Sequence, residues 1–370
     1  MEFALNTRIV VGAGQHKKLG TYLPSWRTAL VVAGANVKAA GIVGAILESL
    51  KQAGITPYIF DQSASDPELE LVERGAEFLR GLGEKIDGIV AVGGGSALDL
   101  GKAIAVMATN PGPLASYEGP ERFPNPPLPI AALPTTAGTG SEVSPSSVLT
   151  DPVARYKFLL WSSRIIPQVA ILDPTLALSA PVSVRLAAGL DALTHAVESV
   201  LSTQSTVYTE PLALRAIELV GKHLPQVVLG QDNLAAMEGM LVAANLAGLA
   251  FSQTRLGVVH ALALPLSARF SVPHGVAVSV LLPHGLDFNE PVAGEHYQKI
   301  LRALEKKGAL PEVIRTFARS LGAPTTMGEL GVRAEEIEAM AQDAAKSGHL
   351  AINPRRASLE DLIAIYRAAM

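Results

Sequence analysis

A regular alternation of strand-like and helix-like segments constrains the fold of the first half of this chain more than any other feature. Six short runs rich in β-branched residues are separated by longer stretches with apolar residues at helical spacing. The strand-like runs are Arg8–Val11, Ala29–Ala33, Tyr58–Phe60, Gly88–Val92, Ile130–Leu133 and Val169–Leu172. The helix-like stretches are Val37–Ala53, Pro67–Leu82 and Ala97–Ala108. Strands that alternate with helices of this length predict a parallel, doubly wound sheet.

The pattern changes after about Ala180, where Ala- and Leu-rich helical segments follow one another with few strand-like runs. The long segments are Val184–Leu201, Pro211–Leu229 and Leu234–Ala250, and the shorter amphipathic ones are Glu295–Lys307, Glu312–Leu321, Ala334–Ala345 and Leu359–Ala369. We therefore predict an α/β domain at residues 1–180 and an all-helical domain at residues 181–370. A length of 370 residues supports two domains, because a single core rarely grows beyond about 250–300 residues.

One stretch fits neither pattern. Asn110–Pro129 contains seven prolines, which exclude a regular helix or a central strand. We expect a long structured loop that either borders a functional site or simply connects two elements.

The absence of cysteine excludes several classes of site. There can be no disulfide framework, thiolate metal site, iron–sulfur cluster or cysteine nucleophile. Any metal must therefore be held by nitrogen and oxygen ligands.

Charge and hydropathy restrict the partners. The net charge of −4 argues against nucleic acid or an anionic membrane as the main partner. Met1–Val11 lacks the pattern of a signal peptide, and no run of about 18 consecutive apolar residues predicts a membrane span. We expect a soluble, cytoplasmic protein. A charged fraction of only 17% indicates extensive buried area, as in a homo-oligomer.

A glycine-rich turn lies between the strand Gly88–Val92 and the following helix. The sequence Gly93-Gly94-Gly95-Ser96 lets the backbone approach a bulky ligand, and the amides at a helix start can donate to a phosphate. Ser96 is placed to cap the helix and to contact a phosphate. An ordinary capped strand–helix turn explains the same sequence equally well.

A second loop strengthens the interpretation as a nucleotide site. Pro134–Glu142 follows another predicted strand and combines several hydroxyl side chains with two glycines, although it could also be a simple turn. Two such loops at the carboxyl ends of parallel strands predict a nucleotide in the crevice of an open sheet. Neither loop has the G-x-G-x-x-G pattern, so the standard Rossmann version is not supported.

Four residues in the second half form a candidate metal site. Asp191 and His195 are four residues apart and share one helical face, although a surface ion pair is the commoner explanation of this spacing taken alone. His260 and His274 both have apolar neighbours, where an imidazole without a partner is costly. One carboxylate and three imidazoles suit Fe²⁺ or Zn²⁺, which would act as a Lewis acid on a substrate oxygen.

The remaining histidines carry less information. His284 could support the metal site or have a core or capping role. The others lie in more polar surroundings, and we expect them at the surface: His16, His223, His296 and His349.

In this order, the motifs resemble the iron-containing (group III) alcohol dehydrogenase family. The resemblance extends from Thr7–Gly14 to Asn353–Arg355, which is nearly the whole chain. It implies a dehydroquinate-synthase-like fold, with a nucleotide-binding α/β domain, an all-helical metal-binding domain and the active site in the cleft between them. It also implies hydride transfer between NAD(P)(H) and a small alcohol or aldehyde.

The resemblance also implies roles for individual residues. The metal ligands fall on Asp191, His195, His260 and His274, with iron as the metal and zinc as a further possibility. Phe251 matches a residue that lines the substrate pocket. The cofactor contacts fall on Gly94, Gly95, Ser96, Asp99, Thr135, Thr136, Thr139 and Lys157.

Two positions depart from the family pattern. Many members have a second histidine four residues after the equivalent of His260, where this chain has Leu264, so proton transfer needs another route. NAD-preferring members often have an aspartate at the end of the second strand, where Gly34 stands here. With Lys38 as the nearest cation, we expect NADP(H) to be preferred over NAD(H) or used alongside it.

Other functions on the same scaffold are the main alternatives. They are glycerol dehydrogenase and a dehydroquinate-synthase-like lyase, although a lyase needs a basic cluster of which only Lys157 is clear. Maleylacetate reductase is disfavoured, because that branch lacks the Asp-x-x-x-His arrangement. A non-catalytic nucleotide- or metal-binding protein is the alternative from a different class, since Leu264 departs from the catalytic pattern.

Overall fold

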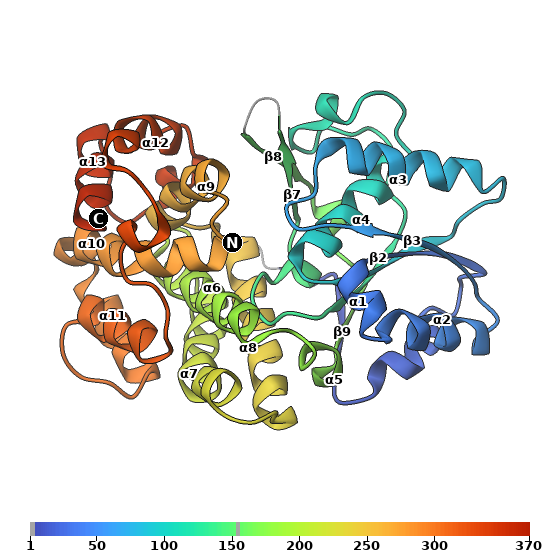
Figure 1. Cartoon of the computed structure of the whole chain (residues 1–370), viewed down its shortest axis with the longest axis horizontal. Helices are drawn as coiled ribbons and strands as arrows, with labels where there is room; N and C mark the ends of the chain where they lie inside the picture. The colour runs from blue at the N-terminus through green and yellow to red at the C-terminus, as the bar shows by residue number, and fades with distance from the viewer. Residues whose placement is uncertain (1–3, 153–155) are drawn as a thin grey trace. The chain divides into compact units, whose positions relative to one another are not determined.

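The computed structural model describes residues 4–152 and 156–370, which form two compact units (Figure 1). An α/β unit contains Ala4–Thr136 and Gly140–Ala180, and a helical unit contains Ala137–Thr139 and Pro181–Met370. Met1–Phe3, the first part of the segment without a signal-peptide pattern, lie outside the described residues.

The α/β unit is built on a parallel six-stranded sheet with the order β1-β9-β6-β4-β2-β3. The six predicted strands are all present, so the prediction of a parallel α/β fold is confirmed. Their bounds are β1 (Arg8–Val11), β2 (Thr28–Gly34), β3 (Thr56–Ser63), β4 (Gly88–Gly93), β6 (Ile130–Pro134) and β9 (Val169–Leu172).

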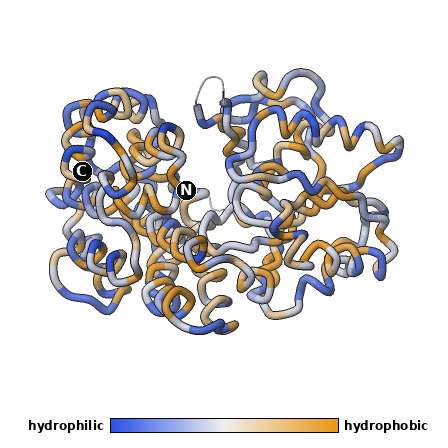
Figure 2. The backbone as a smooth tube through the Cα atoms, viewed as in Figure 1, coloured by the Kyte–Doolittle hydropathy of each residue, from blue (hydrophilic) through white to orange (hydrophobic). Residues whose placement is uncertain are grey.

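Helices cover both faces of this sheet, and β2 shows why. Ala29, Val31 and Ala33 belong to one apolar cluster with α2 (Ile42–Gln52), while Leu30 and Val32 belong to another with α3 (Leu69–Gly81) and α4 (Gly95–Met107). A strand buried on both faces needs a continuous apolar run, as in parallel sheets. Figure 2 accordingly shows the central strands largely in orange.

Two local features of the α/β unit differ from the predictions. The single helix predicted at Val37–Ala53 is divided into α1 (Ala35–Ala39) and α2, because Gly41 has a left-handed φ of 77°. A second, small sheet was not predicted. It contains β5 (Gly119–Pro120), β7 (Ser146–Asp151) and β8 (Tyr156–Trp161), with β7 and β8 antiparallel.

The long proline-rich segment is an ordered loop with two short elements. It contains the 3-10 turn Leu114–Tyr117 and the two-residue strand β5. The Asn110 side chain joins its two ends, since Nδ2 donates to the Val106 carbonyl at 2.9 Å and Oδ1 accepts from the Asn125 amide at 2.8 Å. The loop therefore has its own hydrogen bonds, and a direct role in a site stays a prediction.

The helical unit contains eight helices within its described residues. They are α6 (Val182–Leu201), α7 (Thr209–Leu229), α8 (Leu234–Thr254), α9 (Val258–Phe270), α10 (His274–Ala303), α11 (Leu310–Ser320), α12 (Ile337–Ala344) and α13 (Leu359–Ala368). The predicted helix Glu295–Lys307 is only the end of α10, which has 30 residues. Helix α9 and most of α10 were not predicted, because they contain prolines at 265, 283 and 291 and interior prolines usually end a helix.

Helix α8 is apolar enough for a membrane span by length and composition, and it is the only such helix in the described residues. Its contacts point to a different role. It packs against α6 and α7, and buries Met237, Met240 and Leu241 among other side chains. These properties are those of the core helix of a bundle.

Candidate metal centre

Helix α6 supplies the first two residues of the candidate metal centre. Every residue from 189 to 201 in this helix is buried, so the face with Asp191 and His195 points into the unit. One helical turn separates the two residues, and their Oδ1 and Nε2 atoms are 3.7 Å apart.

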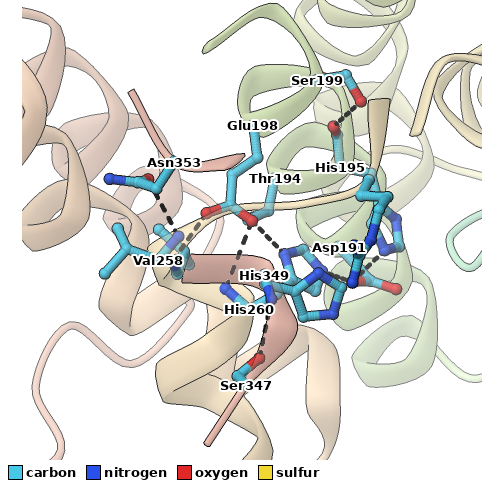
Figure 3. A network of polar contacts seen from close by, with 12 residues as sticks. Asp191, Thr194, His195, Glu198, Ser199, Val258, His260, Ser347, His349 and Asn353 are labelled. Carbon is cyan, nitrogen blue, oxygen red and sulfur yellow. Dashed lines mark hydrogen bonds and ion pairs between the residues drawn. The ribbon is translucent and has the colours of Figure 1, made fainter. Parts of the chain in front are cut away.

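Two further helices bring imidazoles to the same carboxylate. His260 lies in the first turn of α9, and its Nε2 is 3.9 Å from Asp191 Oδ1. His274 begins α10, and its Nε2 is 3.8 Å from the same oxygen. Three helices thus place three imidazoles around one carboxylate oxygen, and Figure 3 shows Asp191, His195 and His260 in this arrangement.

The buried atoms at the centre of this cluster lack hydrogen-bond partners. Within the described residues, no hydrogen bond reaches Asp191 Oδ1 or His260 Nε2, which lie 3.9 Å apart. Such an atom costs about 1–3 kcal/mol if nothing else satisfies it. One ligand atom from each of the three residues lies within 4.8 Å of the others. A divalent cation that prefers nitrogen and oxygen ligands fits this set.

Burial keeps the imidazoles of His195 and His260 neutral. It lowers the pKa of His195 to about 4 and that of His260 well below its usual value. It raises the pKa of the Asp191 carboxyl to about 6, against the opposite effect of His274. At neutral pH His195 and His260 therefore retain their lone pairs and Asp191 its negative charge, as ligation requires.

Two residues beside the cluster were not predicted to take part. The Glu198 carboxyl group, on α6, is hydrogen-bonded to His260, with Oε2 2.5 Å from Nδ1. His349 lies with its ring centroid 6.4 Å from that of His260, and its Nδ1 is buried with no partner among the residues described. Figure 3 shows both beside His260. His349 has charged and polar neighbours in the sequence, so the sequence did not predict its position beside His260.

The surface expectation is wrong for His349 and for His16. Burial lowers the pKa of His349 to about 4. His16 is buried in the α/β unit, and its Nδ1 lies 2.6 Å from Asp173 Oδ2. Both histidines have polar neighbours in the sequence, but contacts with residues far along the chain bury His16 and partly bury His349.

Phe251 and Leu264 complete the surroundings of the cluster. Phe251, on α8, stacks on the ring of His195 with the centroids 4.5 Å apart. Leu264 lies one turn after His260 on α9 and is only partly buried. The predicted pocket residue thus lies against a predicted ligand.

The glycine turn and the threonine loop meet in the α/β unit. The Thr135 amide donates to the Gly93 carbonyl at 2.9 Å. A Cβ at Gly94 would lie 3.3 Å from the Thr136 side chain, so this approach leaves little room for a side chain. Thr139 belongs to the helical unit, together with Ala137 and Gly138.

The capping role predicted for Ser96 is wrong. Gly94 is the N-cap of α4, and Ser96 lies inside the first turn. The Ser96 Oγ instead accepts from the Asp66 amide at 3.3 Å. The Asp66 carboxylate pairs with Lys157, whose Nζ also donates to Thr150 at 3.0 Å. The structure therefore brings Gly94, Ser96 and Lys157 to one area.

Asp99 lies deeper, with both carboxylate oxygens in use. Oδ1 accepts from Ser141 Oγ at 2.6 Å, and Oδ2 accepts from the Val148 amide at 2.9 Å. The nearby Lys102 ammonium donates to the carbonyls of Ser144 and Ser146, and burial lowers its pKa to about 8. These contacts hold the segment after the threonine loop against α4. A direct cofactor contact by Asp99 stays a prediction.

At the end of β2, Gly34 approaches the neighbouring strand closely. A Cβ there would lie 2.8 Å from the Ser63 carbonyl. Lys38, in α1, pairs with Asp61 of β3, with Nζ and Oδ2 2.5 Å apart. The cation that we expected to meet a phosphate therefore already has an acidic partner.

Comparison with known families identifies both parts of the chain. Residues 6–174 match the family described as iron-containing alcohol dehydrogenase, and residues 185–370 match the C-terminal part of the Fe-containing alcohol dehydrogenase family. The chain belongs to the iron-containing alcohol dehydrogenase family.

Individual relatives agree with this assignment. A 1,3-propanediol dehydrogenase from Citrobacter freundii is 40% identical over 89% of this chain and 87% of its own length. An NAD-dependent methanol dehydrogenase from Bacillus methanolicus is 32% identical over 98% of this chain and 97% of its own. The crystal structure of a 1,3-propanediol oxidoreductase has a TM-score of 0.95 at 35% identity, covering 100% of this chain and 99% of that one. This protein is an oxidoreductase of alcohols and aldehydes, and the main functional prediction is supported over the alternatives.

Proposed function

We propose that this enzyme interconverts small alcohols and aldehydes with a divalent iron held by Asp191, His195, His260 and His274. The supporting observation is the convergence of three imidazoles on one buried carboxylate oxygen that has no hydrogen-bond partner among the described residues. Zinc suits the same donors. The metal, when bound, supplies a Lewis acid for the substrate oxygen.

The protein's own residues prepare this chemistry. The burial of Asp191 and His260 excludes water, which strengthens electrostatic interactions in the centre. Phe251 packs on His195 and gives the centre an apolar wall for the carbon chain of a substrate. We assign the nucleotide to Gly94, Gly95, Ser96, Thr135, Thr136 and Thr139, with Lys157 near its phosphates. Asp99 belongs to the same proposed site, and its hydrogen bonds to Ser141 and Val148 also hold the segment after the threonine loop in place.

Turnover under defined metal loading tests this proposal. The purified enzyme, stripped with a chelator and reloaded with Fe²⁺ or Zn²⁺, should oxidise short alcohols, with 1,3-propanediol in the panel because relatives carry that name. Elemental analysis should find metal only in the active preparations. Absence of turnover with every metal and every alcohol or aldehyde would refute the enzymatic proposal.

We further propose that the enzyme uses NADP(H) at least as well as NAD(H), because no carboxylate stands at Gly34 to repel a 2′-phosphate. A relative's name specifies NAD, and the pairing of Lys38 with Asp61 limits the available cation. Asp61→Asn should free Lys38 and raise the ratio of kcat/KM for NADPH to that for NADH about tenfold, which corresponds to about 1.4 kcal/mol.

Lys38→Met is the matched control for this cofactor prediction and should lower the same ratio. An unchanged ratio in both variants would show that this pair lies away from the phosphate. A wild-type kcat/KM for NADPH far below that for NADH would contradict the preference itself.

We also propose a cytoplasmic homo-oligomer, supported by the low charged fraction of the chain. Analytical ultracentrifugation of the purified protein tests the oligomeric part, and a monomer at micromolar concentration would contradict it.

A further inference from the structure

Glu198 is a buried carboxylate that the proposed function does not yet use. It is 3% exposed and lies on α6, facing the start of α9. Its Oε1 accepts from the Val259 amide at 2.7 Å. Its Oε2 accepts from the His260 amide at 3.4 Å and lies 2.5 Å from His260 Nδ1. Both oxygens are therefore committed to two consecutive residues of another helix.

These contacts provide hydrogen-bond acceptors, from outside the helix, for backbone amides in the first turn of α9. The N-cap of α9, Gly257, has no side chain, so the first amides of the helix need other acceptors. Glu198 serves Val259 and His260, while Asn353 Oδ1 accepts from the Val258 amide at 3.1 Å. A negative charge is favourable at a helix N-terminus. The positive end of α9 therefore offsets part of the cost of burying the Glu198 carboxylate.

Gly257 leaves room for both acceptors. A Cβ at this position would lie 2.8 Å from Asn353 Oδ1 and 2.9 Å from Glu198 Oε1. A larger residue would therefore push one of these oxygens away from the helix start. The glycine, the carboxylate and the amide form a single arrangement around the first turn of α9.

The contact with Nδ1 also determines which nitrogen of His260 is free. Burial raises the pKa of Glu198 to about 7, against the backbone amides that favour its ionised form. The ionised carboxylate only accepts hydrogen bonds, so with it Nδ1 carries the proton and Nε2 presents its lone pair. That Nε2 lies 3.9 Å from Asp191 Oδ1 and has no hydrogen-bond partner within the described chain. The Glu198 carboxylate beside Nδ1 therefore leaves Nε2 without a proton and able to bind a metal.

We propose that Glu198 is a positioning residue that fixes the orientation and tautomer of His260 for metal binding. The inference rests on the metal centre proposed above. In protein metal sites, loss of such a carboxylate typically lowers metal affinity about 10–100-fold. A purely structural role, in which Glu198 only caps α9, predicts a loss of stability without a specific loss of affinity.

The test titrates the full-length apoprotein with Co²⁺, whose visible absorption reports both affinity and ligand geometry. Glu198→Gln keeps one oxygen for the Val259 amide but turns an NH₂ group toward His260 Nδ1. This favours the tautomer with a proton on Nε2, so Co²⁺ affinity should fall about 10–100-fold with a changed spectrum. Glu198→Asp retains the charge and should give an affinity between those of wild type and Glu198→Gln.

Two controls separate the possible causes. Asn353→Ala removes the cap of Val258 without touching the His260 ring, and should lower Tm with much less effect on Co²⁺ affinity. His260→Ala tests the metal centre itself. If His260→Ala retains Co²⁺ as wild type does, the proposed centre is wrong. If His260→Ala loses Co²⁺ while Glu198→Gln binds it with wild-type affinity and spectrum, only the positioning role is wrong.

The positioning role of Glu198 can be tested even if one of its variants does not fold. If Glu198→Gln fails to fold, Glu198→Asp decides the matter alone. Weaker binding with an altered Co²⁺ spectrum in Glu198→Asp supports the positioning role. Affinity and spectrum equal to those of wild type overturn it.

Discussion

Replacing His260 by alanine should abolish metal retention and reduce turnover to the background of the assay. The reason is geometric, since Nε2 of this residue lies 3.9 Å from Asp191 Oδ1 and both atoms are buried without hydrogen-bond partners in the described structure. Without this nitrogen, a cation retains fewer ligands and a more open, wetter site. Elemental analysis after gel filtration measures the loss directly, and alcohol oxidation measures its consequence.

A second histidine variant controls for general effects of substitution. His296, on α10, is partly exposed and lies 3.8 Å from Glu210, away from the cluster. His296→Ala should keep the metal content and turnover of wild type. Circular dichroism and a cooperative melting transition should show that both variants are folded. A folded His260→Ala protein with a full complement of metal would refute this ligand assignment.

The parallel sheet could be predicted because its central strands are buried on both faces. Such strands have continuous apolar runs rich in valine, as in Val31–Ala33 and Val90–Val92, which differ clearly from the adjoining helices. The β7–β8 pair could not be found in this way. Ser146, Ser147 and Thr150 interrupt the apolar pattern of β7, and this strand is defined mainly by its antiparallel partner.

The helical unit shows the limit of local signals. Interior prolines at 265, 283 and 291 argue locally against helix, yet packing against neighbouring helices overrides that preference in α9 and α10. The four-residue spacing of Asp191 and His195 indicated a shared face. The apolar neighbours of His260 and His274 suggested that they join this pair, and the family resemblance supported it. The pattern of one helix alone cannot reveal contacts more than 60 residues away.

Glu198 and His349 were missed for a related reason. In the sequence, Glu198 looks like any other residue of a helix, and only its contacts with α9 show its role. His349 follows Lys346 and Ser347, which are typical of an exposed segment. A sequence pattern records the neighbours along the chain, whereas the environment of a buried polar residue is created by neighbours in space.

Replacing Asp191 by asparagine should have opposite effects on metal binding and on apoprotein stability. Metal retention should be lost, because a neutral amide is a far poorer ligand for a divalent cation than a carboxylate. The apoprotein should nevertheless become more stable at pH 7. Burial raises the pKa of Asp191 from 3.8 to about 6, so the ionised form is unfavourable in the folded state. A shift of this size corresponds to about 3 kcal/mol.

The pH dependence follows from the same shift. Between about pH 4 and pH 6 the folded wild-type apoprotein binds more protons at this site than the unfolded chain does, so its free energy of unfolding should fall as pH rises. Asp191→Asn removes this contribution. Denaturant unfolding of both metal-free proteins across this range measures the difference. Asp232→Asn, at a largely exposed residue, is the control and should change stability by no more than about 0.5 kcal/mol.

Adding metal should reverse the order of stability. Wild type gains free energy from binding, because the cation binds only the folded state, while Asp191→Asn gains little. A residue that destabilises the empty protein and stabilises the loaded one is retained for its ligand rather than for the fold. An Asp191→Asn apoprotein less stable than wild type at pH 7 would show instead that the carboxylate supports the helical unit by itself.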